Sequence, residues 1–262
     1  MDFSVNISLV LYKNDKDLVV NCINSCLKYI GLNILYIIDN SPTDIFKNIS
    51  NNRKIHYVHN PANPGFGASH NIAINNSITN QIKYHLVVNP DIFFDEGTID
   101  NIVNFMELHS EVSHLMPKVL YPNHEFQYLC KKNPTIFDLF ARGFLPKKIK
   151  IFFQSRLDKY EYKTHDLNSI IYDIPYLSGC FMFFRTSIFN EVGIFDDNFF
   201  MYLEDADITR RILKVSKTVY YPKATVFHYY SGLTHKKWKF KLITIKSAII
   251  YFNKWGWFNS II

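Results

Sequence analysis

The sequence of 262 residues lacks the features that mark secreted or membrane-spanning proteins. No basic stretch precedes the first apolar residues, so we expect no signal peptide. No apolar run reaches the length that crosses a bilayer. Cys22 and Cys26 have no second Cys or His pair at a zinc-ligand spacing, so buried reduced thiols and a cytosolic setting are expected.

Features of nucleic-acid-binding proteins are also missing. The net charge of +6 is modest, no recognised nucleic-acid-binding motif occurs, and no internal repeat or low-complexity tract is present. Aromatic residues, in contrast, make up 16% of the chain. A Phe-rich core explains most of this excess, with stacking surfaces or an apolar acceptor as the alternative.

Apolar runs alternate with helical spacing along the first part of the chain. This alternation predicts an α/β domain with a parallel sheet and right-handed crossovers. We assign this domain to residues 1–230, with 122–168 as an insertion or mobile segment and 231–262 as a C-terminal helical extension. The expected strands lie at 7–12, 34–38, 55–58 and just before Asp91, and the expected helices at 15–29, 68–79 and 99–108.

Polar residues follow three of the predicted strands, at 12–15, 39–41 and 89–91. Parallel strands place these ends on one edge of the sheet, where open α/β folds bind ligands. Asp91 comes directly after a buried strand and the turn-forming pair Asn89-Pro90. A carboxylate at this edge suits a divalent cation that neutralises a diphosphate, although many strands end in Asp for turn reasons alone.

A glycine-containing loop at residues 60–71 precedes a predicted helix. Gly65 and Gly67 permit close backbone approach, and the helix start offers free N–H groups to a phosphate. The loop is not a Rossmann fingerprint, because the third glycine is missing. An ordinary glycine turn is the alternative interpretation.

An acidic cluster occupies residues 204–207, with Glu204, Asp205 and Asp207. A carboxylate with acidic neighbours or partial burial becomes a better proton acceptor, which suits a general base. Stabilisation of a helix start by its dipole is the simpler alternative.

His228 follows a predicted strand, and a lone His is more often structural than a metal ligand. Imidazole and the carboxylate of Asp91 would nevertheless make a workable metal pair. The tail from His235 to Phe258 interleaves lysines with aromatic residues. Such a helix suits an anionic membrane surface, or it packs its aromatic side chains on the domain.

Together these residues resemble glycosyltransferase family 2, the inverting sugar transferases with a GT-A fold: a Rossmann-like, mostly parallel sheet flanked by helices. The Asn-Pro-Asp variant is most similar to the bacterial rhamnosyltransferase-like branch, which builds surface polysaccharides. Many relatives have a second carboxylate beside the one that matches Asp91. The motifs occur in the family's order at 38–41, 63–67 with Asn71, 89–91, 178–196, 204–207 and His228.

The resemblance implies a role for each matching residue. Asp205 would deprotonate the acceptor hydroxyl, Glu204 would assist by binding the acceptor, and Asp91 with His228 would hold Mg²⁺ or Mn²⁺. The nucleotide-sugar pocket would be lined by Tyr12, Asp39, Asn63, Gly65, Gly67, Asn71, Asn89, Asp91 and Gly179, with Asp39 on the nucleotide base.

The resemblance also implies the partners. The expected donor is dTDP-rhamnose, with UDP-linked galactofuranose, glucose, galactose or an N-acetyl sugar as alternatives. The expected acceptor is a glycan or a polyprenyl-linked saccharide at the inner face of the plasma membrane. A sugar nucleotidyltransferase is disfavoured because residues 8–15 contain no glycine for a triphosphate loop. The non-enzymatic alternative is a nucleotide-sugar-binding subunit without turnover.

Overall fold

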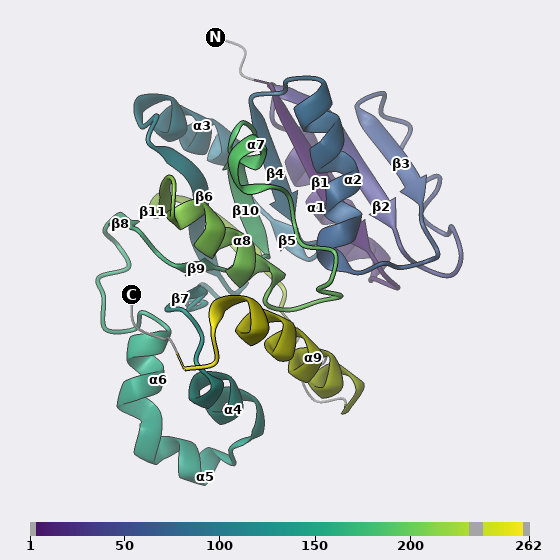
Figure 1. The fold of residues 1–262 in the computed structure, drawn as a ribbon. Helices are drawn as coiled ribbons and strands as arrows, with labels where there is room; N and C mark the ends of the chain where they lie inside the picture. The colour runs from purple at the N-terminus through teal and green to yellow at the C-terminus, as the bar shows by residue number, and fades with distance from the viewer. Residues whose placement is uncertain (1–3, 231–237, 259–262) are drawn as a thin grey trace.

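A mixed β-sheet covered by helices on both faces forms the centre of the molecule (Figure 1). The computed structural model describes residues 4–230 and 238–258, and within them this sheet has nine strands. The order is β3 (Ile55–His59), β2 (Leu32–Asp39), β1 (Val5–Leu11), β4 (Tyr84–Val88), β10 (Phe181–Arg185), β6 (Val112–Leu120), β11 (Lys217–His228) and β5 (Ile92–Phe93), with β8 (Ile171–Tyr172) beside β11.

The sheet is mostly parallel, as expected from the alternation of strands and helices. Strands β3, β2, β1 and β4 run parallel, and so do β6 and β11. Strand β10 lies between β4 and β6 and is antiparallel to both, and β5 is antiparallel to β11. The α/β expectation is therefore confirmed, with reversed strands in the half of the sheet that the repeating pattern did not cover.

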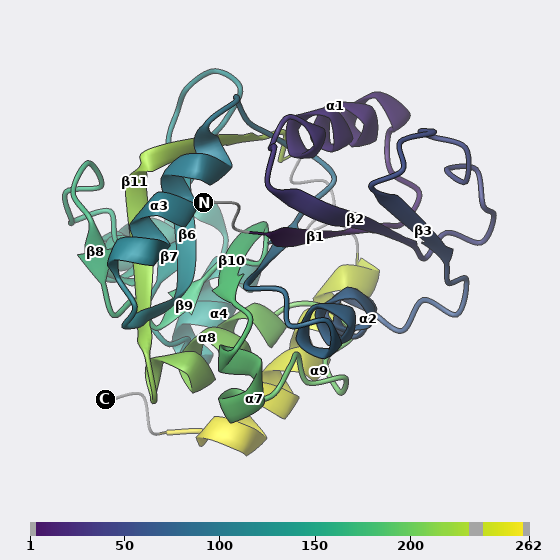
Figure 2. The ribbon, with the colours of Figure 1, turned by 90° about the horizontal axis from the view of Figure 1, so that it is seen from above.

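Helices cover the two faces of the sheet (Figure 2). Helices α1 (Lys16–Leu27) and α3 (Thr98–Leu108) lie on one face, and α2 (Phe66–Thr79), α7 (Ile188–Val192) and α8 (Glu204–Leu213) lie on the other. Strand β10 serves both layers because successive side chains point to opposite faces. Phe181 and Phe183 pack in the α1/α3 core, whereas Met182 and Phe184 pack in the α2/α7/α8 core.

Local sequence signals set the ends and packing of α1. The side chain of Asp15 caps the helix by accepting hydrogen bonds from the N–H groups of Asp17 and Leu18, at 2.9 and 3.2 Å. Cys22 and Cys26 lie on its buried side, and both are free thiols, as expected from their spacing.

The region expected as an insertion or mobile segment forms a helical lobe. It contains β7 (Cys130–Lys131), α4 (Ile136–Phe144), α5 (Lys147–Lys150), the 3₁₀ helix η1 (Ile151–Phe153) and α6 (Gln154–Tyr160). Thr135 and Asp138 form a capping box at the start of α4, and Arg156 pairs with Asp138 at 2.9 Å. Strand β7 pairs with β9 (Tyr176–Leu177), which joins the lobe to the main domain.

The C-terminal extension contains the helix α9 (Trp238–Trp255), which lies along the lobe (Figure 1). Its lysines and histidine at 235–237 fall outside the described residues. Tyr251 and Phe252 are buried in one cluster with Leu139 of α4. This packing is the second of the two alternatives considered for the tail. It leaves other side chains of α9 facing outward.

A single buried carboxylate fastens α9 to α8. Asp207 is fully buried, and its oxygens accept hydrogen bonds from Trp255 Nε1 at 2.9 Å and from Lys254 Nζ at 3.0 and 3.1 Å. Arg211, one turn along α8, also pairs with Asp207 at 2.9 Å. A buried charge needs this degree of compensation, so the third member of the acidic cluster is structural.

Three fully buried histidines lie within the sheet and its helix layer. His70 and His85 both contact the hydroxyl of Ser8, at 2.7 and 2.9 Å, and His114 stacks on Phe184. Burial lowers the pKa of His85 and of His114 to about 3, and that of His70 well below its usual range. All three are therefore neutral in the folded protein at neutral pH.

We predict that His114→Phe makes folding less sensitive to acid. In the unfolded chain His114 binds a proton near pH 6.5, but the folded residue does not. The free energy of unfolding of the parent therefore falls by about 1.4 kcal/mol for each pH unit below that value. Urea unfolding from pH 7.5 to 4.5 measures the free energy of unfolding of parent and variant. The difference between the two free energies isolates His114, because the opposing effects of buried carboxylates are present in both proteins. Exposed His56→Gln is the control, and an unchanged pH slope in His114→Phe would contradict the prediction.

Candidate active site

The ends of β1, β2 and β4 meet at one edge of the sheet, as expected from the polar residues that follow them. Leu9 of β1 is opposite Val88 of β4, so the segments after these two strands lie side by side. Between β1 and β2, Asn40 N–H donates to the Leu11 carbonyl at 2.8 Å, and Lys13 N–H donates to Ser41 Oγ at 2.9 Å. This edge is the candidate active site.

Tyr12 and Asp39 occupy this edge in different ways. The Tyr12 ring is 47% exposed, which leaves it open to stack on a ligand. Asp39 is fully buried, and its two oxygens accept hydrogen bonds from Ser41 N–H at 2.9 Å and from Tyr57 Oη at 2.8 Å. Asp39 thus shapes the turn after β2, and its contact with a nucleotide base stays a prediction.

The glycine loop packs against the segment that precedes the acidic cluster. A Cβ at Gly65, where φ is +113°, would overlap the Phe200 carbonyl oxygen, and a Cβ at Gly67 would come within 2.8 Å of the Phe195 side chain. Phe66 N–H donates to the same Phe200 carbonyl at 2.8 Å. Both glycines are therefore required by contacts within the chain, and their approach to a nucleotide sugar stays a prediction.

Asn71 stabilises the same contact between the glycine-loop region and the segment before the acidic cluster. Its Nδ2 donates to the Phe195 carbonyl at 2.9 Å and to Asp197 Oδ1 at 2.7 Å, and its Oδ1 accepts from Phe195 N–H at 3.1 Å. Both ends of the amide are engaged within the chain, so the side chain acts as a clamp between α2 and residues 195–197. Asn63, the remaining predicted loop residue, is partly exposed and has a positive φ of 47°.

Residues 178–180 connect the two candidate carboxylate sites. Gly179 N–H donates to Asp205 Oδ2 at 2.9 Å, and the next carbonyl, that of Cys180, accepts from Asn89 N–H at 2.9 Å. Burial raises the pKa of the Cys180 thiol to about 12, and the charges of Asp91 and Asp205 both contribute. Both carboxylates therefore lie near Cys180, and their metal and base roles stay predictions.

Two consecutive residues with left-handed backbone begin the acidic cluster. Tyr202 and Leu203 have φ values of 72° and 67°, which non-glycine residues seldom adopt. Such backbone is costly and occurs often at active sites, where it directs a side chain. Here it ends directly before α8 and leaves Glu204 and Asp205 buried beside residues 176–179.

Glu204 and Asp205 have different environments. Burial and the adjacent Asp205 charge raise the pKa of Glu204 well above its usual range, and its Oε2 has no hydrogen-bond partner. Burial also raises the pKa of Asp205, but Lys131 and the N–H groups of Gly179 and Ala206 oppose that rise. The pair therefore holds its proton on Glu204 and its negative charge on Asp205.

Lys131 was not among the residues that sequence reasoning selected. It lies in β7 opposite Tyr176 of β9, and its ammonium group is 4.5 Å from the centre of the Tyr176 ring. Burial lowers the pKa of Lys131 to about 8. The lysine pair at 131–132 was the only sequence signal, and nothing in it indicated which lysine faces inward.

Asp91 and His228, the predicted metal pair, lie together at the ends of β4 and β11. His228 Nε2 is 3.2 Å from Asp91 Oδ1. Gln127, which sequence reasoning also missed, determines the state of the ring. Its Nε2 donates to the His228 carbonyl at 2.8 Å, so its Oε1 faces His228 Nδ1 at 2.9 Å and must accept a hydrogen there.

That arrangement fits a divalent cation. With Nδ1 donating to Gln127, His228 Nε2 faces the Asp91 carboxylate either as a protonated partner or with a lone pair available to a metal. A hydrogen bond from the second ring nitrogen is typical of metal-binding histidines. In the described ranges no group of three or more His, Cys, Asp and Glu side chains is placed to hold a metal ion, so diphosphate oxygens and water would supply the other ligands.

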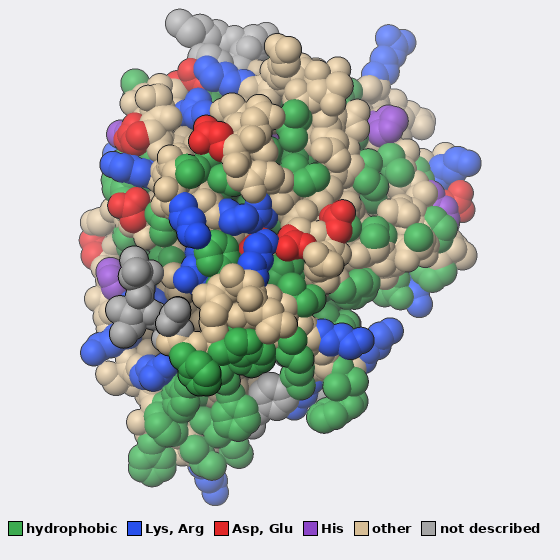
Figure 3. Space-filling model, in the orientation of Figure 1, with side chains coloured by type: hydrophobic (Ala, Val, Ile, Leu, Met, Phe, Trp, Pro, Cys, Tyr) green, Lys and Arg blue, Asp and Glu red, His purple; other side chains and the backbone are tan. Residues whose placement is uncertain are grey.

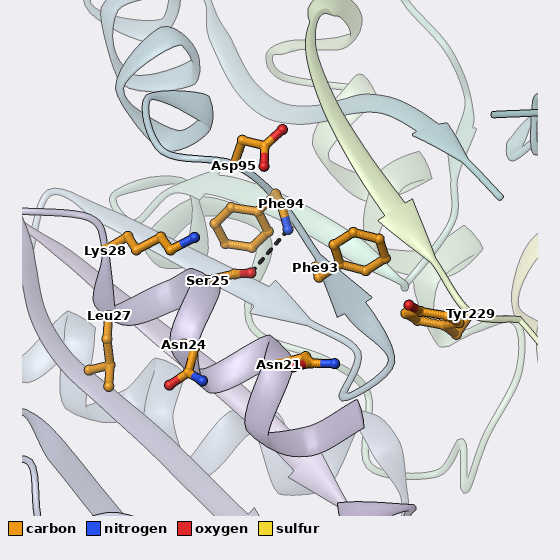
Figure 4. A pocket seen from close by; sticks show the side chains of 9 residues that line it. All are labelled: Asn21, Asn24, Ser25, Leu27, Lys28, Phe93, Phe94, Asp95 and Tyr229. Atoms are coloured by element: carbon orange, nitrogen blue, oxygen red, sulfur yellow. Dashed lines mark hydrogen bonds between the residues drawn. The ribbon is translucent and has the colours of Figure 1, made fainter. Parts of the chain in front are cut away.

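A separate open hollow of about 670 Å³ lies next to this pair, between α1 and β5 (Figure 4). Phe93 and Tyr229 form its aromatic side, with ring centres 5.1 Å apart. Tyr229 N–H donates to the Asp91 carbonyl at 2.9 Å, so a residue that lines the hollow contacts the backbone of the predicted metal pair. None of the predicted site residues lines it.

Comparison with solved structures agrees with this fold. The structure matches GalNAc-T7 solved with UDP, GalNAc and Mn²⁺, with a TM-score of 0.64 and 13% identity over 87% of this chain and 43% of that chain. It also matches S. aureus TarS 1–349, with a TM-score of 0.56 and 14% identity over 93% of this chain and 65% of that chain. The fold is thus that of GT-A glycosyltransferases.

Sequence comparison defines the family. Residues 9–193 match the model of glycosyl transferase family 2, and the chain belongs to this family. An N-acetylglucosaminyl-diphospho-decaprenol L-rhamnosyltransferase of Mycobacterium tuberculosis is 28% identical over 55% of this chain and 46% of its own length. The low-salt glycan biosynthesis hexosyltransferase Agl10 of Haloferax volcanii is 24% identical over 79% of this chain and 61% of its own length.

The chain thus spans about half to three-fifths of the length of these curated relatives. The family match also ends before Glu204, Asp205 and His228. The case for the roles of these three residues therefore depends on the geometry described above.

We predict that Lys131→Met makes the reaction more sensitive to acid. Loss of the positive charge raises the pKa of Asp205, so the acid limb of the pH profile of kcat/KM moves to higher pH. The neighbouring Lys132 is exposed, and Lys132→Met is the matched control. An acid limb that coincides in parent and Lys131→Met would show that Lys131 is only structural.

Proposed function

We propose that this chain transfers a sugar from a nucleoside diphosphate to an acceptor hydroxyl, with inversion at the anomeric carbon. The main support is that two different carboxylate sites lie near the same short segment, residues 178–180. One site, Asp91 with His228, suits a cation at a diphosphate. The other, Asp205 beside Glu204, suits a base at an acceptor.

The chemistry follows from this separation. Asp205 accepts the proton of the acceptor hydroxyl as its oxygen attacks the anomeric carbon, and the bond from that carbon to the diphosphate oxygen breaks on the opposite face. The protonated Glu204 offers a hydrogen bond to the acceptor. A divalent cation, when bound by Asp91 and His228, neutralises the charge of the departing diphosphate.

For the donor we propose dTDP-rhamnose, with a UDP-sugar as the alternative. The Asn89-Pro90-Asp91 motif and the similarity to the mycobacterial L-rhamnosyltransferase favour rhamnose. The GT-A neighbour solved with UDP favours the alternative. The exposed Tyr12 ring at the end of β1 is available to either nucleotide base.

For the acceptor we propose a glycan or a polyprenyl-linked saccharide of a bacterial surface polysaccharide, met at the cytoplasmic side of the plasma membrane. Similarity to a diphospho-decaprenol rhamnosyltransferase and to a glycan biosynthesis hexosyltransferase supports this class of acceptor. The C-terminal segment 231–262 is proposed as a peripheral contact with membrane or acceptor, and only residues 238–258 of it are described.

We predict that the donor of this enzyme raises its midpoint of thermal unfolding more than other nucleotide sugars do. A ligand that binds only the folded state raises the midpoint by mass action, and no acceptor is needed. We expect the largest shift with dTDP-rhamnose plus Mn²⁺ or Mg²⁺, and loss of the metal-dependent part in Asp91→Asn. A larger shift with a UDP-sugar would replace the donor, and no shift with any nucleotide sugar would contradict the proposal.

The two acidic residues are predicted to respond differently to amide substitution. Asp205→Asn removes the proton acceptor and should lower kcat by roughly 10²–10⁴-fold, while donor-induced thermal shifts stay near those of the parent. Glu204→Gln resembles the protonated state that burial already imposes, so most of the activity should remain. Normal turnover by Asp205→Asn would exclude Asp205 as the base.

A further inference from the structure

Exposed apolar side chains gather on the helical lobe, at the turn from α5 into η1. We call residues 147–153 the helical elbow. Phe152 is 85% exposed and Ile151 is 71% exposed, values unusual for large apolar residues in a folded domain. The space-filling view shows a broad apolar surface over this lower end of the molecule (Figure 3). Further exposed members of this surface are Ile136, Phe140, Ile149 and Phe153.

A second apolar stripe lies on α9. Its exposed members, Trp238, Leu242, Ile245 and Ile249, follow helical spacing, so they lie along one side of the helix. The buried residues Tyr251 and Phe252 pack with Leu139 of α4. The lobe and α9 therefore belong to one packed unit, and helices α5 and α9 both lie in the lower half of the molecule in Figure 1.

The charge around this surface is almost all of one sign. Asp138 is the only acidic residue in 136–156, and it is buried and paired with Arg156. Helix α9 has no acidic residue. The basic residues of these two segments are Arg142, Lys147, Lys148, Lys150, Arg156, Lys239, Lys241, Lys246 and Lys254. Three of them, Arg142, Arg156 and Lys254, form ion pairs with Glu161, Asp138 and Asp207, so the positive charge of the surface comes from the lysines of the other positions.

We propose that the helical elbow is a membrane anchor that inserts Ile151 and Phe152 into the headgroup region of an anionic bilayer. Apolar side chains interleaved with lysines are the combination that binds such a surface. A second copy of the chain fits less well, because a symmetric contact would bring two basic surfaces together without acidic partners. No helix in the described part of the chain has the length and apolar character to cross a bilayer.

The position of the elbow gives the anchor a use in the proposed reaction. The same lobe contributes Lys131, whose charge acts on Asp205, and its helix α4 packs in one cluster with Tyr176 and Leu203. Docking through the elbow would thus bring the acceptor side of the site near the lipid surface. This consequence rests on the proposed function, whereas the anchor itself does not.

Vesicle binding without donor or acceptor tests the anchor separately from catalysis. The full chain should sediment with phosphatidylcholine vesicles that contain phosphatidylglycerol, and far less with pure phosphatidylcholine. The double variant Ile151→Ser/Phe152→Ser should lower the partition coefficient by at least about tenfold, since two apolar side chains no longer insert. The matched control is Leu108→Ser, which changes an 82% exposed residue on α3.

Three outcomes would overturn the anchor. They are equal binding by the double variant and the parent, equal binding to neutral and anionic vesicles, or a dimer in light scattering that the double variant dissociates. The altered side chains are exposed, so thermal midpoints of parent and variants should agree and show that each is folded. Loss of vesicle binding with unchanged donor-induced thermal shifts would support the anchor whatever the outcome for the proposed reaction.

Discussion

The docking of residues 195–203 onto the glycine loop is the constraint on which the site depends. Gly65 and Asn71 hold this segment through backbone contact and a fully engaged amide. The segment continues through Tyr202 and Leu203, whose backbone is left-handed, and leads into Glu204 and Asp205. Asp205 then accepts a hydrogen bond from Gly179 N–H. A side chain at Gly65 would displace the Phe200 backbone, so the loop expected at the donor also influences the position of Asp205, the proposed base.

The three buried carboxylates of α8 have two kinds of environment. Asp207 has Arg211, Lys254 and Trp255 as partners, so its charge is stabilised and serves to attach α9. Glu204 and Asp205 share no ion pair of that kind, and the proton stays on Glu204. The difference arises from the partners that each residue meets: Arg211 and α9 contact Asp207, whereas Asp205 contacts the Gly179 backbone.

Much of the fold was predictable because local patterns there agree with the tertiary structure. Strands β1, β2 and β4 are mostly buried apolar runs, and the side-chain oxygen of Asp15 caps α1, as expected for an Asp before a helical pattern. The meeting of strand ends follows from parallel topology alone. Lys131 and Gln127 were not predictable, because their partners are 45 or more residues away in sequence and neither lies in a periodic element. A glycine pattern likewise predicts that another group approaches the backbone closely, but it does not identify that group.

Several candidate site residues lie beyond the range of the family match. Within the matched range the chain supplies the sheet edge and Asp91; after it come the acidic cluster, His228 and α9. The lobe inserted between β6 and β10 reaches the site through Lys131 and ends in exposed apolar side chains. A substitution in the lobe can therefore alter the base by changing a nearby charge, or alter surface binding without touching the base. The proposed acceptor chemistry and the proposed surface attachment thus involve one structural unit, whereas the proposed donor edge belongs to the central sheet of the GT-A fold.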